Sequence, residues 1–177
     1  LMNKVLKKYQ NYFIPLVLIL IVSFSRLVPH PYNFTPLLAT GIFAGFYFKQ
    51  FYLSLFIVIF SMFIGDLFLG FHNTMFFTYI ALIVPVAFGI YAKHLKLSSI
   101  FTSSVISSIS FFVITNFGAW LTLDIYEKNF SGLINSYAMA IPFFHNTIIS
   151  TFFYLLLFKF LFDVLINKKK YLNLLFK

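Results

Sequence analysis

The chain has 177 residues, of which 61% are hydrophobic and 23% aromatic, while only 10% are charged. A soluble domain of this length does not need so much apolar surface, so the composition predicts an all-α integral membrane protein. The net charge of +9 does not indicate a nucleic-acid partner, because in a membrane protein the positions of the charges decide. The absence of cysteine excludes disulfides and thiolate chemistry.

Six apolar segments are expected to cross the lipid bilayer as helices and to form one transmembrane domain over residues 1–177. Their ranges are roughly 12–28, 34–48, 51–70, 74–92, 100–121 and 136–162. The first segment follows a basic start, as a signal peptide does, but it lacks an A-x-A-like cleavage site. We therefore expect it to be a retained helix.

The distribution of basic residues orients these helices. With six spans, eleven of the thirteen basic residues fall on the side of the two termini, and only Arg26 and Lys128 fall on the other side. Cytoplasmic loops are enriched in lysine and arginine, so both termini are predicted to be cytoplasmic, in a bacterial inner membrane. The lysine-rich tail is expected to contact anionic lipid headgroups.

The segment 26–36, between the first two helices, holds three prolines, His30 and the chain's only arginine. Irregular backbone and charge at membrane depth are tolerated only where they pack against protein or line a cavity. The residue before a proline avoids helical backbone, which keeps this segment extended. The segment is therefore predicted to be a lid over an outward-facing cavity.

Most other informative polar residues fall in the outer half of the predicted bundle, where polar groups indicate a functional site. Asp66 and Asn116 lie near the outer ends of the third and fifth helices. His145 and Asn146 lie in the outer half of the sixth helix. We expect these four residues to form the floor of the cavity.

Each of these residues also has a structural explanation. Asp66 could pair with Arg26 and only hold the first and third helices together, because a buried carboxylate needs a partner or a proton. His145 could be hydrogen-bonded across the bundle, and Asn116 could join two helices. Trp120 and Tyr126 could belong to the outer aromatic belt.

Two patterns indicate helix packing. The motif Gly41-x-x-x-Gly45 allows another helix to approach the second helix closely. A stripe on the fifth helix suits packing either within the chain or against another subunit, and both alternatives stay open; it consists of Ser99, Ser103, Ser107 and Ser110.

Signatures of known catalytic sites are absent from the sequence, including G-x-S-x-G, H-E-x-x-H and phosphate-binding glycine loops. No enzymatic activity and no intrinsic cofactor are therefore expected. A membrane enzyme that uses His145 or Asp66 as a base on a lipid or cofactor is the alternative, and a structural membrane subunit is another.

Four motifs carry a family resemblance over residues 20–160. They are Arg-x-x-Pro-His-Pro-x-Asn-Phe-Thr-Pro at 26–36, Gly-Asp-Leu-Phe-Leu-Gly-Phe-His at 65–72, Thr-Asn-Phe-Gly-Ala-Trp at 115–120 and Pro-Phe-Phe-His-Asn-Thr at 142–147. They resemble a family of small bacterial membrane proteins that is related to the S-components of energy-coupling-factor vitamin transporters. That family is also related to solitary S-component-like proteins proposed to import cobalamin.

The resemblance implies a six-helix S-component-like bundle that captures a vitamin-sized solute, with cobalamin as the best single guess, and that works with energising transporter subunits or by passive movement and trapping. Cobalamin-type relatives are expected to use a cysteine as cobalt ligand, which this chain lacks, so His72 would supply an imidazole instead. Arg26 would hold an anionic group, and Trp120 and Tyr126 would stack on a ring. The full set of predicted binding residues is Arg26, His30, Asn33, Asp66, His72, Asn116, Trp120, Tyr126, His145 and Asn146.

Overall fold

The computed structural model describes the backbone of residues 2–175 and the side chains of residues 13–164. This part of the chain contains helices and no strand, which confirms the all-α prediction. The described helices are α1 (Met2–Leu27), α2 (Leu37–Phe48), α3 (Phe51–Leu69), α4 (Met75–Ala81), α5 (Ile83–Tyr91), α6 (Leu97–Thr122) and α7 (Phe130–Leu175).

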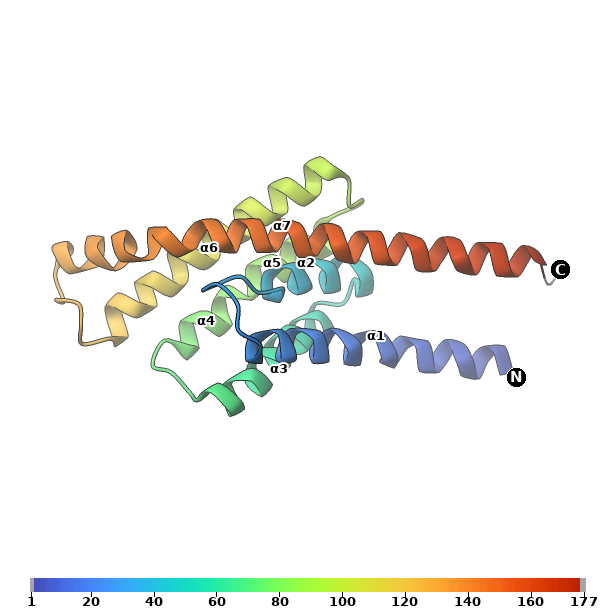
Figure 1. The fold of residues 1–177 in the computed structure, drawn as a ribbon, viewed down its shortest axis with the longest axis horizontal. Helices are drawn as coiled ribbons and strands as arrows, with labels where there is room; N and C mark the ends of the chain where they lie inside the picture. The colour runs from blue at the N-terminus through green and yellow to red at the C-terminus, as the bar shows by residue number, and fades with distance from the viewer. Residues whose placement is uncertain (1, 176–177) are drawn as a thin grey trace.

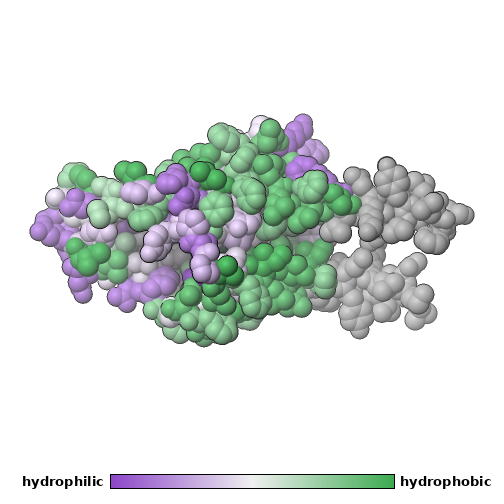
Figure 2. All heavy atoms as spheres, viewed as in Figure 1, coloured by the Kyte–Doolittle hydropathy of each residue, from purple (hydrophilic) through white to green (hydrophobic). Residues whose placement is uncertain are grey.

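Three of these helices are long and apolar enough to cross a membrane: α3, α6 and the part of α7 from Phe130 to Val164. Shorter apolar helices cover Phe13–Leu27, Leu37–Phe48 and Met75–Tyr91. Apolar residues dominate the middle of the surface, and hydrophilic residues gather at the end away from the termini (Figure 2). These are the features of a helical membrane protein.

The helix boundaries differ from the predicted ones where a polar segment is helical or where an apolar segment is not. α1 and α7 continue well beyond the predicted ranges 12–28 and 136–162, because lysine and glutamine favour helix although they are polar. α2 starts at Leu37 rather than at residue 34, because a turn from Pro31 to Phe34 and then Pro36 precede it. The predicted segment 74–92 is broken at Leu82 into α4 and α5.

The ends of the helices divide into two groups. Both termini lie at the same end of the molecule, and the connections 49–50 and 92–96 lie in that half (Figure 1). The connections 28–36, 70–74 and 123–129 lie in the opposite half (Figure 1). This arrangement places the candidate lid far from the termini.

The helix α2 forms the centre of the bundle, and every residue from Leu37 to Gly45 is buried. It packs most extensively on α5. The two helices approach closely because a side chain at Gly45 would collide with the Val86 carbonyl, and one at Gly89 would collide with the Ile42 carbonyl. The glycine motif predicted to bring two helices together therefore does so between α2 and α5.

The serine stripe faces the inside of the chain along the contact between α6 and α7. Ser103 and Ser107 are buried, and so are Ser104 and Ser108 beside them. Ser108 Oγ donates a 3.5 Å hydrogen bond to Thr151 Oγ1 of α7. These serines serve packing within the chain.

Candidate functional site

A cavity of about 710 Å³ lies in the half of the molecule that contains the segment 28–36. The end of α1 and the lid segment form one wall, and α6 and α7 form the opposite wall. Two residues each come from α2 and α3, and one comes from α4. Six of the ten predicted binding residues line this cavity: Arg26, His30, Asn33, His72, Asn116 and Tyr126. Its volume is within the usual range of small-molecule sites, about 300 to 1,000 Å³.

Asp66 lies behind the cavity wall and does not line the cavity, in contrast to its predicted place in the floor. Its side chain is completely buried, and Oδ1 lies 2.8 Å from Arg26 Nη1. The Tyr79 hydroxyl donates a 2.7 Å hydrogen bond to the other carboxylate oxygen, Oδ2. Asp66 therefore joins α1, α3 and α4, which is the structural role that the sequence left open.

Arg26 reaches Asp66 because Gly65, the residue before Asp66, has no side chain. A Cβ atom at Gly65 would collide with the guanidinium group of Arg26. Nη1 also donates a 2.8 Å hydrogen bond to the Met62 carbonyl oxygen. Within the described residues, no hydrogen bond engages Nε or Nη2, so these donors of a cavity-lining arginine are available to a ligand.

The lid segment is attached to α7. Asn146 Nδ2 donates a 3.0 Å hydrogen bond to the Tyr32 carbonyl oxygen, and Ser150 Oγ donates one of 3.4 Å to that of Asn33. The Tyr32 ring meets the Phe143 ring edge-on, with 5.4 Å between centroids. Asn33 has a φ of 62°, a left-handed conformation that asparagine tolerates better than most residues.

Two histidine rings line the cavity. His30 Nδ1 lies 2.6 Å from the Val28 carbonyl oxygen, which can only accept a hydrogen bond, so Nδ1 carries a proton in this contact. His72 is half-buried, and its Nδ1 lies 2.8 Å from Thr74 Oγ1. Among residues 13–164 there is no group of three side chains suited to hold a metal ion.

Besides Asp66, three predicted binding residues lie outside the cavity. Trp120 donates its indole N–H to the Glu127 carbonyl oxygen at 2.9 Å, which closes the connection between α6 and α7. Asn146 acts through the lid, as described above. His145 is exposed, because it lies two residues, or about 200° of helix rotation, from both Phe143 and Thr147 of the lining face.

The sequence reasoning does not single out the hydroxyl groups that line the deeper part of the cavity. They belong to Thr115 of α6 and to Thr147, Ser150 and Thr151 of α7. The three residues on α7 follow the spacing i, i+3, i+4, which places them on one helix face. That spacing is the signal that could have identified them.

Asn116 lines the cavity, but its side-chain amide donates a hydrogen bond within its own helix. Nδ2 donates a 2.7 Å hydrogen bond to the Phe112 carbonyl oxygen four residues earlier. The side-chain carbonyl oxygen has no donor among the described residues. The asparagine therefore does not join two helices, and it offers the cavity an acceptor.

The aromatic residues of the cavity wall complement these polar groups. Phe111 and Phe112 of α6 and Phe143 of α7 line the cavity, and Tyr32 and Tyr126 come from the connections 28–36 and 123–129. Such walls suit a solute with a flat apolar part. The arrangement can bind an amphiphilic molecule through ring contacts, hydroxyl groups and one guanidinium.

Comparisons with known proteins give one match. Residues 6–174 match a family described as "Family of unknown function (DUF6580)". No curated protein and no solved structure matches the chain. The match covers nearly the whole chain, and the chain therefore belongs to the family of unknown function DUF6580.

Proposed function

We propose that this protein binds a vitamin-sized amphiphilic solute in the cavity beneath the segment 28–36 and carries it across the bacterial cytoplasmic membrane. In this proposal the chain crosses the membrane six times, with α4 and α5 together forming the fourth span. Both termini are cytoplasmic, and the cavity opens to the outside. The observation that carries the proposal is a cavity of about 710 Å³ at the end of the bundle opposite the termini.

The lining of the cavity supports a solute with a negatively charged or strongly accepting group. Arg26 offers its Nε and Nη2 donors, and no acidic side chain lines the cavity among residues 13–164. Because Asp66 already balances the charge of Arg26, the site does not demand a multiply charged anion. A solute with one carboxylate, phosphate or amide group and one ring fits this chemistry best.

The fixed lid supports uptake rather than a structural role for the polar residues. The segment 28–35 contributes backbone and side chains to the cavity and is attached to α7 by two hydrogen bonds. Release of these bonds would open a path from the outer surface without rearranging the bundle. The energy for transport would come from an energising partner subunit or from trapping of the solute inside the cell.

The test is growth rescue of vitamin auxotrophs that lack their own uptake systems, together with binding by the purified protein. Ala140→Trp fills the cavity from α7, whereas Ile141→Trp places the same ring on the neighbouring surface position, which is 62% exposed. We expect one vitamin to rescue growth with the natural protein and with Ile141→Trp, but not with Ala140→Trp. Equal membrane levels of both variants are the control.

Either of two results would contradict the proposal: rescue by none of the vitamins despite good membrane expression, or full rescue by Ala140→Trp. If cobalamin is the rescuing vitamin, the purified protein should change the visible spectrum of bound cobalamin, and His72→Ala should abolish this change. An unchanged spectrum in the variant would exclude His72 as the cobalt ligand while leaving the uptake function standing.

A further inference from the structure

A second cavity, of about 290 Å³, lies in the half of the molecule that carries both termini. It is bounded by the end of α2, by the connection between α5 and α6, and by α7. Its apolar walls come from Phe46, Leu95 and Phe162. Phe160 and Leu161, which precede Phe162 in the sequence, do not line the cavity but add exposed apolar surface to α7.

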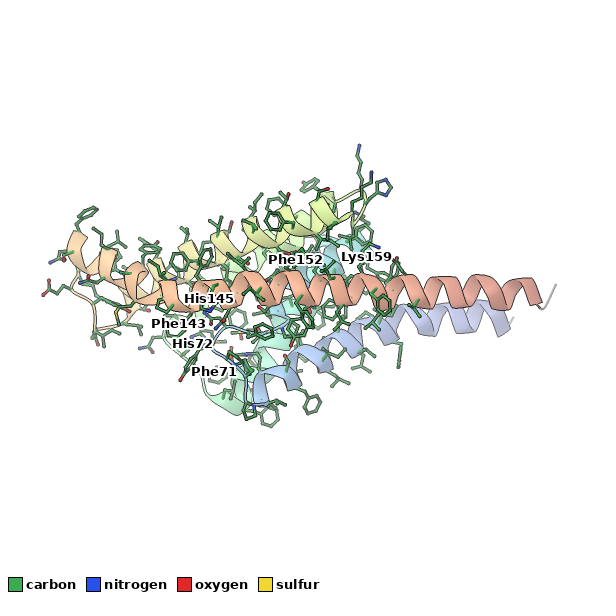
Figure 3. The ribbon with its side chains drawn as sticks, turned by 45° about the horizontal axis from the view of Figure 1, so that its top comes forward. Phe71, His72, Phe143, His145, Phe152 and Lys159 are labelled. Atoms are coloured by element: carbon green, nitrogen blue, oxygen red, sulfur yellow. The ribbon has the colours of Figure 1, made fainter. Side chains whose placement is uncertain are left out.

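The polar groups of this second cavity are mostly basic. His94, Lys96 and Lys159 line it, and Asp163 is the only acidic residue among the described side chains of its lining. Lys159 forms an ion pair with Asp163 one turn further along α7. Figure 3 shows Lys159 at the far side of the bundle from His72. Within the described residues, His94 and Lys96 have no acidic partner.

The start of α6 adds a second source of positive potential. Lys96 is the N-cap residue of this 26-residue helix, and no side chain caps its first backbone N–H groups. The N-terminus of a helix carries a partial positive charge and favours anions, so a lysine there is electrostatically unfavourable without an anionic partner. Backbone N–H groups at such a terminus commonly bind phosphate.

The connection that carries these basic residues is held in place by Lys49. Its Nζ donates hydrogen bonds to the carbonyl oxygens of Gly89, Ile90 and Ala92, at 3.3, 2.8 and 2.5 Å. These carbonyls end α5 and lead directly into the segment 93–96. The basic groups are thus displayed by a fixed backbone, which favours a specific site over a diffuse charged surface.

We propose that this second cavity binds the phosphate group of an anionic phospholipid of the cytoplasmic leaflet. His94, Lys96 and the N-terminus of α6 hold the headgroup, and the acyl chains lie on Phe162 and the exposed apolar residues of α7. Basic cavities between membrane helices on the cytoplasmic side are suited to anionic headgroups. The site is independent of the solute cavity, which lies in the other half of the molecule.

The experiment is a lipid titration of the purified full-length protein in neutral detergent, followed by native mass spectrometry. We expect one phosphatidylglycerol to bind in preference to phosphatidylcholine. Lys96→Gln should weaken phosphatidylglycerol binding about fivefold, the effect of one basic side chain at an anionic headgroup. Lys93→Gln makes the same charge change in the same connection but outside the cavity, so it should leave binding unchanged.

Asp163→Asn should strengthen the binding of phosphatidylglycerol severalfold, because it removes the only acidic group among the cavity's described residues. Equal weakening by Lys93→Gln and Lys96→Gln would overturn the proposal in favour of general surface attraction. Equal binding of phosphatidylcholine would exclude a headgroup site. Displacement of the lipid by millimolar inorganic phosphate would assign the site to a soluble anion instead. Unchanged thermal unfolding of each variant without lipid confirms that it folds.

Discussion

At the scale of single residues, Arg26 and Asp66 form an ion pair whose two partners differ in burial. Asp66 is completely buried, whereas 14% of the Arg26 side chain is exposed and lines the cavity. An uncompensated carboxylate in the interior must stay charged without solvent or take up a proton, and both cost free energy. An arginine at a cavity wall can instead be hydrated from the cavity. The two partners therefore contribute differently to stability.

We predict that Arg26→Met destabilises the fold by about 3 to 5 kcal/mol, the usual cost of removing one partner of a buried ion pair. Asp66→Asn should cost clearly less, because the amide still accepts from Tyr79 and Arg26 gains cavity water. The double variant should be more stable than Arg26→Met alone. The measurement is the free energy of unfolding in mixed micelles, and equal losses for the two single variants would refute this asymmetry.

At the scale of the elements, the lid and α7 act as one unit. Asn146 does not touch the cavity, but its side chain holds the backbone of Tyr32. A hydrogen bond makes a net contribution of about 1 kcal/mol to stability. Loss of the Asn146 hydrogen bond should therefore make local opening of the lid about fivefold more frequent. We predict this acceleration in Asn146→Ala for the amide hydrogen exchange of residues 28–35.

Asn135→Ala provides the matched control for this measurement. Asn135 is also on α7, is exposed and makes no side-chain hydrogen bond among the described residues. Its replacement should leave exchange in the lid as it is. Equal exchange in the lid for all three proteins would show that the ring contact between Tyr32 and Phe143 and the Ser150 hydrogen bond hold the segment without Asn146.

The contact between α2 and α5 depends on three glycines that tolerate an added methyl group to different degrees. A Cβ at Gly89 or Gly45 would overlap backbone carbonyl oxygens, which cannot move aside without shifting a helix. A Cβ at Gly41 would meet the Pro85 side chain at 3.2 Å, which a small shift relieves. We predict that Gly89→Ala and Gly45→Ala each destabilise by about 1 to 3 kcal/mol.

Gly41→Ala should change the stability by much less than either of these variants. Thermal unfolding of the three purified proteins in one detergent measures the order. A similar loss for all three would mean that helix propensity or lipid contact governs the effect, instead of the close approach of the two helices.

At the scale of the whole molecule, the topology can be tested with unusual clarity because the chain has no cysteine. Asp124 is exposed in the connection 123–129, and Lys93 is exposed in the connection 92–96 at the other end. A single cysteine at residue 124 should react with a membrane-impermeant maleimide added to intact cells. A single cysteine at residue 93 should react only after the cells are opened. The reverse pattern would invert the proposed orientation.

The sequence predicted well those features that depend on local pattern. Apolar runs located the helical regions, with α4 and α5 as one segment. The prolines of residues 29–36 marked the non-helical segment at the cavity, although this segment contains a turn and is not extended throughout. The sequence could not place the helix ends at Met2 or Leu175, since hydropathy ends where polar helix formers begin. The predicted segments also missed the break at Leu82, although Pro85 in the first turn of α5 lacks the N–H group that would bond to the Ala81 carbonyl oxygen.

The candidate site shows the same division. Counting residues from the outer ends of the helices placed Asn116 at the same end of the bundle as Arg26 and His72, and all three line the cavity. Whether a residue at this depth lines the cavity depends on its angular position around the helix. On α7, His145 lies on the exposed face, whereas Thr147 and Ser150 lie on the face that lines the cavity. The partner of a helix face is a tertiary property that a single sequence does not contain.

The sequence by itself determined that the chain is a helical membrane protein with its polar residues gathered towards one end, because composition and hydropathy follow from side-chain chemistry alone. Only the tertiary structure decided that Asp66 supports Arg26 from behind the wall, that Asn146 holds the lid, and that basic residues from the connection before α6 and from α7 line a second cavity. These roles depend on which helices meet and at what rotation, and packing between elements far apart in the chain sets both.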